Sequence, residues 1–267
     1  MKPFRVLVVG DVVGNPGRRA CTQIIPRLRQ TEKIDFVIAN VENLAGGSGI
    51  TESTTRELFT HGVDAMTSGD HVFKKKEAEA LIQNDSRILR PANYPASVPG
   101  CGSTVIKTSQ GIKVGVLNLL GRVFLKTVDC PFEAAKREVE KMRRETSIIF
   151  VDMHAEATSE KVAMGWFLDG KVSAVFGTHT HVQTADERIL PRGTGYITEI
   201  GMCGPYHSVI GRDIDQVLHM FLTQMPVRLD VAHEDSRLSG ALFDIDPETG
   251  KTLSVKRVHE KVEDEIH

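Results

Sequence analysis

Short runs of apolar and β-branched residues recur along the chain, and Gly, Asp, Asn or His bounds each run. The runs are too short to be helices, so they predict strands that are buried in the protein. The predicted strands cover residues 4–9, 36–41, 114–120, 147–151 and 172–176, and a shorter apolar segment lies at 65–68.

Segments with helical character lie between these strands, at residues 18–29, 54–61, 75–83, 132–144 and 160–168. Strands that alternate with helices predict a largely parallel α/β core. Antiparallel additions are expected as a hairpin over residues 104–120, which follows a Pro- and Gly-rich loop at 90–100, and as a closing hairpin over 242–258. A short charged tail is expected at 260–267, and residues 1–267 are expected to form one domain.

The charge balance and the apolar content narrow the class of protein. The chain has 33 Lys and Arg against 35 Asp and Glu, a net charge of −2, which argues against a stable complex with long nucleic acid or a membrane surface. No apolar run reaches the roughly 18 residues of a spanning helix and no signal peptide is recognised, so a cytoplasmic protein is expected. The four scattered cysteines contain no CxxC pair and are expected to be reduced thiols.

Residue types that bind metal ions gather where the predicted strands end. In open α/β sheets, ligands collect at the carboxyl ends of the strands. A lone Asp at such a position commonly forms a turn or caps a helix, and a lone buried His is commonly a core residue. Here the pattern recurs at five strand ends, which is the informative observation. The residues concerned are Asp11, Glu42, Asn43, Asp70, His71, His154, His179 and His181.

These residue types suit a site that holds two divalent ions. Such a site needs a bridging carboxylate and a mixed shell of nitrogen and oxygen ligands. Glu42 is the candidate bridge, and a bend after the strand could direct His179 and His181 each to one ion. A two-metal site lowers the pKa of bound water toward about 7 and stabilises the attacking and leaving oxygens of an in-line displacement at phosphorus. Composition and spacing do not distinguish a phosphodiester from a phosphomonoester substrate.

A set of motifs spread over nearly the whole chain resembles one known family, the calcineurin-like metallophosphoesterases, and within it the bacterial YmdB-like branch of 2′,3′-cyclic-nucleotide 2′-phosphodiesterases. The wider superfamily has Asp-x-His after its first strand and Gly-Asp after its second, whereas this chain and the narrower branch share a different pattern there. The motifs are GDVVG at 10–14, NVENLAGG at 40–47, GDH at 69–71, RPANYP at 90–95, NLLGRV at 118–123, VDMHAE at 151–156, GTHTH at 177–181 and GMCGPY at 201–206.

The resemblance implies a fold, a set of ligands and a reaction. The fold would be the α/β metallophosphoesterase sandwich of two mixed β-sheets flanked by helices. The implied reaction is the hydrolysis of a 2′,3′-cyclic nucleotide, a small phosphodiester, to a 3′-nucleotide, with His71 as the general acid. The two metal ions would be Fe or Mn, with Zn also compatible. One ion would be held by Asp11, Glu42, Asn43 and His181, and the other by Glu42, Asp70, His154 and His179.

One position departs from the branch, which usually has Asn where this chain has Asp70. An extra carboxylate should hold its metal more tightly and make the bridging water less acidic. Asn93, Arg122 and His207 are candidates for substrate contacts, and Asp152 and Glu156 could orient His154. Two other functions stay open: a different metal-dependent phosphatase or phosphodiesterase, and a regulatory protein that binds metal and nucleotide with weak catalysis. A homo-oligomer is also left open.

Overall fold

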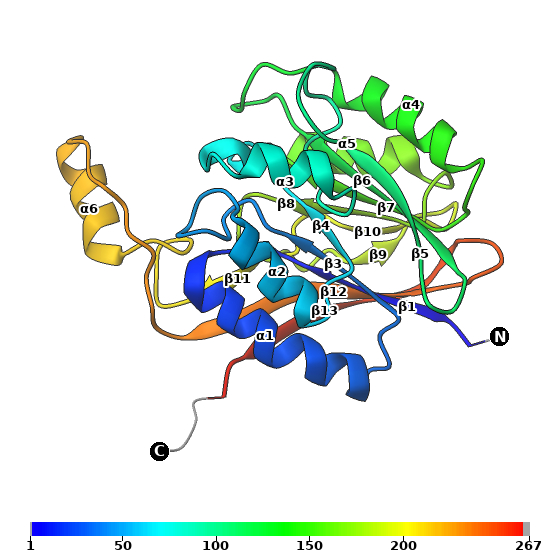
Figure 1. Ribbon diagram of the computed structural model, residues 1–267, viewed down its shortest axis with the longest axis horizontal. Coiled ribbons are helices and arrows are strands. Elements are labelled where there is room, and N and C mark those ends of the chain that lie inside the picture. Colours follow the sequence, from blue (N-terminus) through cyan, green and yellow to red (C-terminus); the bar gives the residue numbers. More distant parts are fainter. Residues whose placement is uncertain (1, 264–267) are drawn as a thin grey trace.

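Two mixed β-sheets pack face to face within residues 2–263, the part of the chain that the computed structural model describes (Figure 1). This arrangement confirms the predicted sandwich of two mixed sheets flanked by helices. The four cysteines all lie in the described part, and all are free thiols.

The first sheet has seven strands within the described residues, in the order β2, β11, β12, β1, β3 and β4, with β13 paired to β12. Strands β1, β3 and β4 are parallel to one another, β2 is parallel to β11, and β12 runs antiparallel to β1. The carboxyl ends of β1, β3 and β4 therefore meet at one edge. The strands are β1 (Phe4–Val9), β2 (Asp11–Val12), β3 (Phe36–Asn40), β4 (Ala65–Thr67), β11 (Met202–Pro205), β12 (Ser236–Ile245) and β13 (Thr252–Lys261).

The second sheet has six strands in the same part of the chain, in the order β5, β6, β7, β8, β10 and β9. Strands β6, β7, β8 and β10 are parallel, and β5 and β9 are antiparallel edge strands. The predicted hairpin at 104–120 is the β5–β6 pair. The strands are β5 (Ser103–Lys107), β6 (Lys113–Leu120), β7 (Ile149–His154), β8 (Ala174–Thr178), β9 (Arg188–Ile189) and β10 (Gly195–Ile197).

Helices cover the outer face of each sheet (Figure 1). Helix α1 packs on the first sheet with α2 beside it, and α4 and α5 pack on the second. Alternate residues of β1 serve different layers: Val6 and Val8 join the core between the sheets, and Leu7 and Val9 join the core under α1. Burial on both faces explains why this strand is apolar throughout. The helices are α1 (Gly14–Thr31), α2 (Glu52–Thr60), the 3₁₀ turn η1 (Val72–Lys74), α3 (Ala78–Asn84), α4 (Pro131–Met142), α5 (Thr158–Leu168) and α6 (Ile214–Thr223).

The observed elements differ from the predicted ones at several ends. Helix α1 begins four residues earlier than expected, at Gly14. The helix expected at 75–83 is divided into η1 and the shorter α3. The expected tail is also partly wrong, because β13 continues through Lys261, paired with Arg237 of β12; residues 264–267 lie outside the described part.

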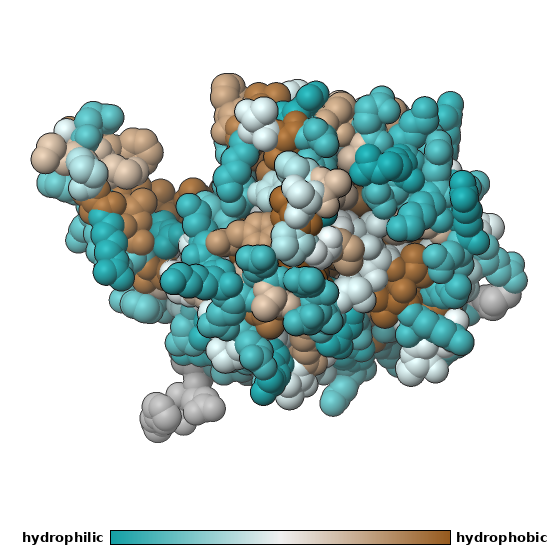
Figure 2. Space-filling model, turned by 45° about the horizontal axis from the view of Figure 1, so that its top comes forward, coloured by the Kyte–Doolittle hydropathy of each residue, from teal (hydrophilic) through white to brown (hydrophobic). Residues whose placement is uncertain are grey.

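Helix α6 projects from the body of the protein on an extended arm (Figure 1). Only Val217 of this helix is buried, and Leu218, Phe221 and Leu222 are exposed. Figure 2 shows hydrophobic surface along the same projection. The exposed apolar residues of this helix are therefore not covered by other parts of the described chain. None of the helices in residues 2–263 has the length and apolar character needed to cross a lipid bilayer.

Candidate metal centre

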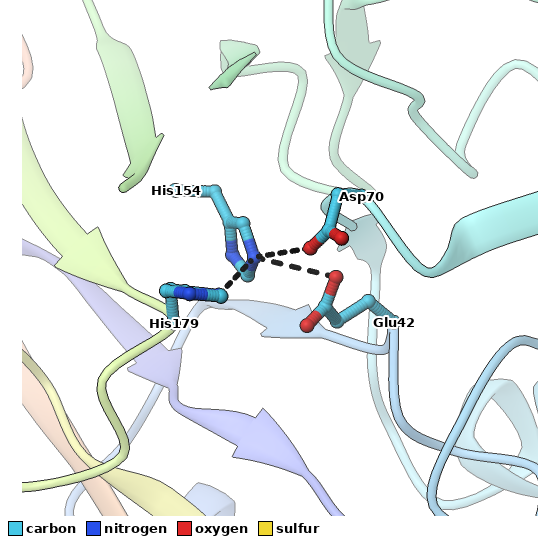
Figure 3. A group of neighbouring side chains, drawn as sticks. All are labelled: Glu42, Asp70, His154 and His179. Atoms are coloured by element: carbon cyan, nitrogen blue, oxygen red, sulfur yellow. Dashed lines mark hydrogen bonds and ion pairs between the residues drawn. The ribbon is translucent and has the colours of Figure 1, made fainter. Parts of the chain in front are cut away.

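Side chains from both sheets meet at the edge where the parallel strands end. Glu42 and Asp70 follow β3 and β4 of the first sheet, and His154 and His179 stand at the ends of β7 and β8 of the second. In Figure 3 these four side chains point toward one another, and their potential ligand atoms all lie within 4.8 Å of each other. His154 Nε2 is 3.1 Å from His179 Nδ1 and 3.3 Å from Glu42 Oε2. The four residues form a group that could hold a metal ion.

Three more of the predicted residues adjoin this group. Asp11 Oδ1 lies 4.0 Å from His181 Nε2, and Asp11 Oδ2 accepts a hydrogen bond from the His179 backbone N–H at 3.0 Å. Asn43 Nδ2 lies 3.4 Å from His181 Nε2 and donates to Glu42 Oε1 at 3.1 Å. One oxygen of Glu42 therefore faces His154, and its other oxygen faces Asn43. This is the placement that a carboxylate shared by two adjoining ligand groups requires.

His71 lies at the open side of the cluster. Its backbone N–H donates to Glu42 Oε2 at 3.1 Å, and its Nδ1 lies 3.2 Å from Asn43 Oδ1. The His71 side chain is 35% exposed, whereas that of His154 is fully buried. His71 is thus fixed by its backbone while its ring remains accessible to a molecule that enters from solvent.

The chemistry of the cluster fits bound metal ions. Among the described residues, Asp11 Oδ1 and Asp70 Oδ1 are buried without any hydrogen-bond partner, a costly state for a carboxylate oxygen. A Cβ atom at Gly69 would lie 2.2 Å from His154 Nε2 and 2.3 Å from Glu42 Oε2, so only glycine leaves this space clear. Imidazole nitrogens and carboxylate oxygens are ligands that Mn, Fe and Zn accept.

A buried chain of hydrogen bonds orients His154. Its Nδ1 lies 2.8 Å from Thr178 Oγ1, and the Thr178 hydroxyl donates to Asp152 Oδ1 at 2.6 Å. Because that hydroxyl proton goes to the carboxylate, the Thr178 oxygen accepts from His154 Nδ1–H. Asp152 therefore acts on His154 through Thr178, which directs Nε2 into the cluster.

The turn that carries His179 and His181 has an unusual backbone. Both residues have positive φ, 97° and 65°, which is uncommon for residues other than glycine. Thr180 between them donates its backbone N–H and its hydroxyl to Glu199 Oε2, at 3.1 Å and 2.6 Å. Lys161 Nζ lies 2.7 Å from the same oxygen, and both charged side chains are almost fully buried. A buried ion pair thus anchors the turn on which two histidines of the cluster stand.

The electrostatic environment divides the cluster into groups that hold a proton and groups that do not. Burial raises the pKa of Asp11 to about 7, against the opposing effect of nearby imidazoles. Burial alone would lower the pKa of His154, but the Glu42 and Asp11 carboxylates raise it to about 10. Burial and the neighbouring His154 lower the pKa of His179 to about 3. Without metal at neutral pH, His154 is therefore protonated and His179 has a free lone pair.

Metal binding should release protons. The ligands must lose their protons to bind. Below pH 7 both Asp11 and His154 hold a proton, so loading should release about two protons near pH 6. Near pH 8 Asp11 is already ionised, but a metal-bound water that ionises near pH 7 would release a proton in its place, so the number should stay near two while the apparent affinity rises with pH. Calorimetry of Mn²⁺ binding in buffers with different ionisation enthalpies measures this number. Heats that do not depend on the buffer would contradict these protonation states.

The three predicted substrate residues lie in different surroundings. Asn93 is buried, and its amide bonds the backbone of Leu120, at the end of β6, and of Asp129, in the loop that follows, which gives it a structural role. The side chain of Arg122 is exposed. His207 is paired with Glu234 at 2.9 Å, beside a surface hollow of about 710 Å³ that His233 also lines. The structure brings none of the three side chains into contact with the cluster.

Two contacts of the cluster, made by Glu156 and Lys126, are not among those predicted from the sequence. Glu156 was one of two candidates to orient His154, and its Oε2 lies 3.2 Å from Nε2 of His179, because Glu156 stands beyond the end of β7. Lys126 was not singled out, yet its Nζ donates to the backbone carbonyl of Asp70. No short-range signal marks Lys126, since a long loop brings it to the site.

Comparison with known proteins agrees with this geometry. The chain matches the family described as YmdB-like protein over residues 7–258. A relative from Bacillus subtilis (strain 168), named 2′,3′-cyclic-nucleotide 2′-phosphodiesterase, is 46% identical over 255 residues, which cover 96% of each chain. A solved structure of a hypothetical protein from Thermus thermophilus superimposes with a TM-score of 0.91 at 38% identity and covers 97% of this chain and 99% of that one. A structure from Mycoplasma pneumoniae, described as a novel phosphatase, has the same TM-score at 33% identity, covering 98% and 95%. The chain therefore belongs to the YmdB-like protein family.

Proposed function

We propose that the protein is a phosphodiesterase with two metal ions that hydrolyses 2′,3′-cyclic nucleotides to 3′-nucleotides. The observation that carries this proposal is a group of four potential ligands that three further candidates adjoin, all from five strand ends, with two buried carboxylate oxygens that lack any hydrogen-bond partner in the described chain. The name of the Bacillus subtilis relative supports the choice of substrate class.

The ligands divide into two sets that share Glu42. In the first set Asn43 contacts Glu42 Oε1 and lies beside His181, which faces Asp11. In the second set His154 contacts Glu42 Oε2 and is grouped with Asp70 and His179. Bound metal ions, Fe or Mn by preference and Zn as a further option, would supply Lewis acidity and a nucleophilic hydroxide at neutral pH. Asn43 has its Nδ2 toward His181 and its oxygen toward His71, so a half-turn of the amide would present the oxygen to the first set.

His71 is the proposed general acid. Attack on phosphorus breaks the bond to the 2′ oxygen of the ribose, and that oxygen leaves as an alkoxide unless it receives a proton. The His71 ring lies between Asn43 Oδ1 and Asp70 Oδ2, at 3.2 Å and 3.7 Å, and is open to solvent. It can therefore donate the proton to the 2′ oxygen while water supplies the hydroxyl that remains on phosphorus.

The decisive experiment joins metal analysis to product identification. We expect about two metal ions per chain after reconstitution with Mn²⁺, and conversion of 2′,3′-cyclic AMP to 3′-AMP, identified by chromatography against 2′-AMP. Metal without turnover of the cyclic nucleotide, but with turnover of aryl phosphates, would favour another phosphatase. Metal and nucleotide binding without turnover of any ester would favour a regulatory protein.

Asp70→Asn should shift the pH dependence of the reaction. The change removes one negative charge beside the reacting water and should lower the pKa of that water, so the acidic limb of the kcat/KM profile should move to lower pH while activity is retained. Metal affinity should fall in the same variant, because a neutral amide oxygen replaces the carboxylate. An unchanged profile together with unchanged affinity would show that Asp70 is not a ligand.

A further inference from the structure

The loop that follows β6 is attached to two residues of the metal centre. At its start the Gly121 backbone N–H donates to the His154 carbonyl at 2.8 Å. Five residues further along the loop, Lys126 Nζ donates to the Asp70 carbonyl. Between these points the backbone N–H groups of Arg122 and Val123 donate to the Glu160 carboxylate at 3.0 Å and 3.1 Å. The segment 121–126 is thus fixed alongside the centre, from the His154 side to the Asp70 side.

Phe124 stands in the middle of this segment with an exposed ring and a strained backbone. Its side chain is 87% exposed, the largest exposure among the large hydrophobic side chains of the described residues. Its φ is 62°, in the left-handed region, where a bulky residue is rare and strained. No core packing compensates for either cost. An aromatic ring that a fixed loop exposes to solvent, two residues from Lys126, indicates that Phe124 has a binding role rather than a structural one.

We propose that Phe124 is the stacking platform for the base of the nucleotide substrate. This inference rests on the proposed function and specifies how the base is held. The ribose separates the base from its 2′,3′-phosphate, so a base platform must lie beside the metal centre and not within it, which is where the fixed segment places Phe124. Arg122 and Lys126 stand two residues before and two residues after Phe124, so the segment also carries positive charge, which suits an anionic nucleotide.

This mode of binding predicts little discrimination among bases. Every nucleobase has a π-face that can stack on a phenyl ring, whereas discrimination requires hydrogen bonds to the base edges. The backbone N–H groups of Arg122 and Val123 are already used by Glu160, so these two donors are not free to read a base edge. The platform therefore favours nucleotides over cyclic phosphates that lack a base.

The test compares a substrate with a base and one without. Phe124→Leu keeps an apolar side chain but removes the π-face, and should raise KM for 2′,3′-cyclic AMP by about 5- to 100-fold. It should leave KM for glycerol 1,2-cyclic phosphate, which has the same five-membered diester and no base, unchanged. Phe124→Tyr should restore the wild-type KM for the nucleotide. Equilibrium binding of 3′-AMP should weaken in Phe124→Leu by a similar factor, independently of turnover.

Controls separate this inference from the proposed function and from a structural role. Failure of the wild-type protein to hydrolyse either cyclic phosphate would reject the proposed function. If the wild-type protein hydrolyses both cyclic phosphates and Phe124→Leu has the same KM values as the wild type, the platform is rejected while the proposed function stands. Phe221→Leu, which alters an exposed ring on the projecting α6, should change neither KM. A lower melting temperature, or a changed sedimentation coefficient, in Phe124→Leu with no effect on KM would show that the ring serves folding or a contact between copies instead.

Discussion

His71→Ala should lower kcat for 2′,3′-cyclic AMP by about two to four orders of magnitude while the protein keeps its metal. The ring donates to the departing 2′ oxygen in our proposal, and the alkoxide is a poor leaving group without that proton. Metal content should hold because the ring meets the cluster only through Asn43 Oδ1 at 3.2 Å and carboxylates beyond 3.5 Å. Elemental analysis and kcat on the same preparation measure both quantities.

A substrate with a good leaving group provides the sharper comparison. Bis(p-nitrophenyl) phosphate releases p-nitrophenolate, which needs no proton, so His71→Ala should retain most of its activity on this diester. His219→Ala, an exposed histidine on α6, should behave as wild type on both substrates. An equal loss on the two substrates would show that His71 acts in binding or in the assembly of the site and not as an acid.

Lys161→Met should destabilise the protein by about 3–5 kcal/mol and reduce metal occupancy. Met has nearly the same length as Lys, so packing is retained while Glu199 loses its buried counter-charge, 2.7 Å away. Glu199 also holds Thr180 through two hydrogen bonds, and the strained turn of His179 and His181 depends on that anchor. Denaturant unfolding gives the free energy, and Mn²⁺ titration gives the occupancy.

A double-mutant cycle isolates the contribution of the buried charge pair to stability. Lys161→Met combined with Glu199→Gln removes both charges and keeps an acceptor for Thr180, so it should recover part of the lost stability. Lys113→Met breaks the exposed pair with Glu145, whose side chains are 45% and 51% exposed, and should change stability by less than about 1 kcal/mol. If the buried and the exposed variants lose equal stability, the anchor interpretation is wrong.

The candidate cluster was accessible from sequence because strand ends are marked locally. A buried parallel strand is apolar along its whole length, so the first polar residue after it indicates where the strand leaves the core. Asp11, Glu42 and His179 occupy such positions, and Asp70 follows three residues after the end of β4. Parallel strands bring their carboxyl ends to one edge. The eight residues predicted from this rule lie together in the structure.

The sequence also contains local signals for two features that were not predicted, the start of α6 and the buried Lys161. Asp213 caps α6 by accepting a hydrogen bond from the Gln216 N–H, a spacing that predicts a helix start, although α6 was not predicted. Lys161 shares a helix face with Met164, Gly165 and Leu168, which are all buried. A lysine on an apolar face needs a buried partner, but the sequence does not show that Glu199, 38 residues away, is that partner.

The sequence by itself determined the alternation of strands and helices, the polar residues at the strand ends and the resemblance that joins them, because each depends on spacing within a short segment. Only the tertiary structure decided which side chains from loops and distant strands contact the site. In the structure Glu156 contacts His179 and not His154, and Lys126 bonds the Asp70 carbonyl. Asn93 bonds the backbone of Leu120, at the end of β6, and of Asp129, in the loop that follows. Such contacts depend on the path of the chain in space, which hydrophobic periodicity along one segment does not record.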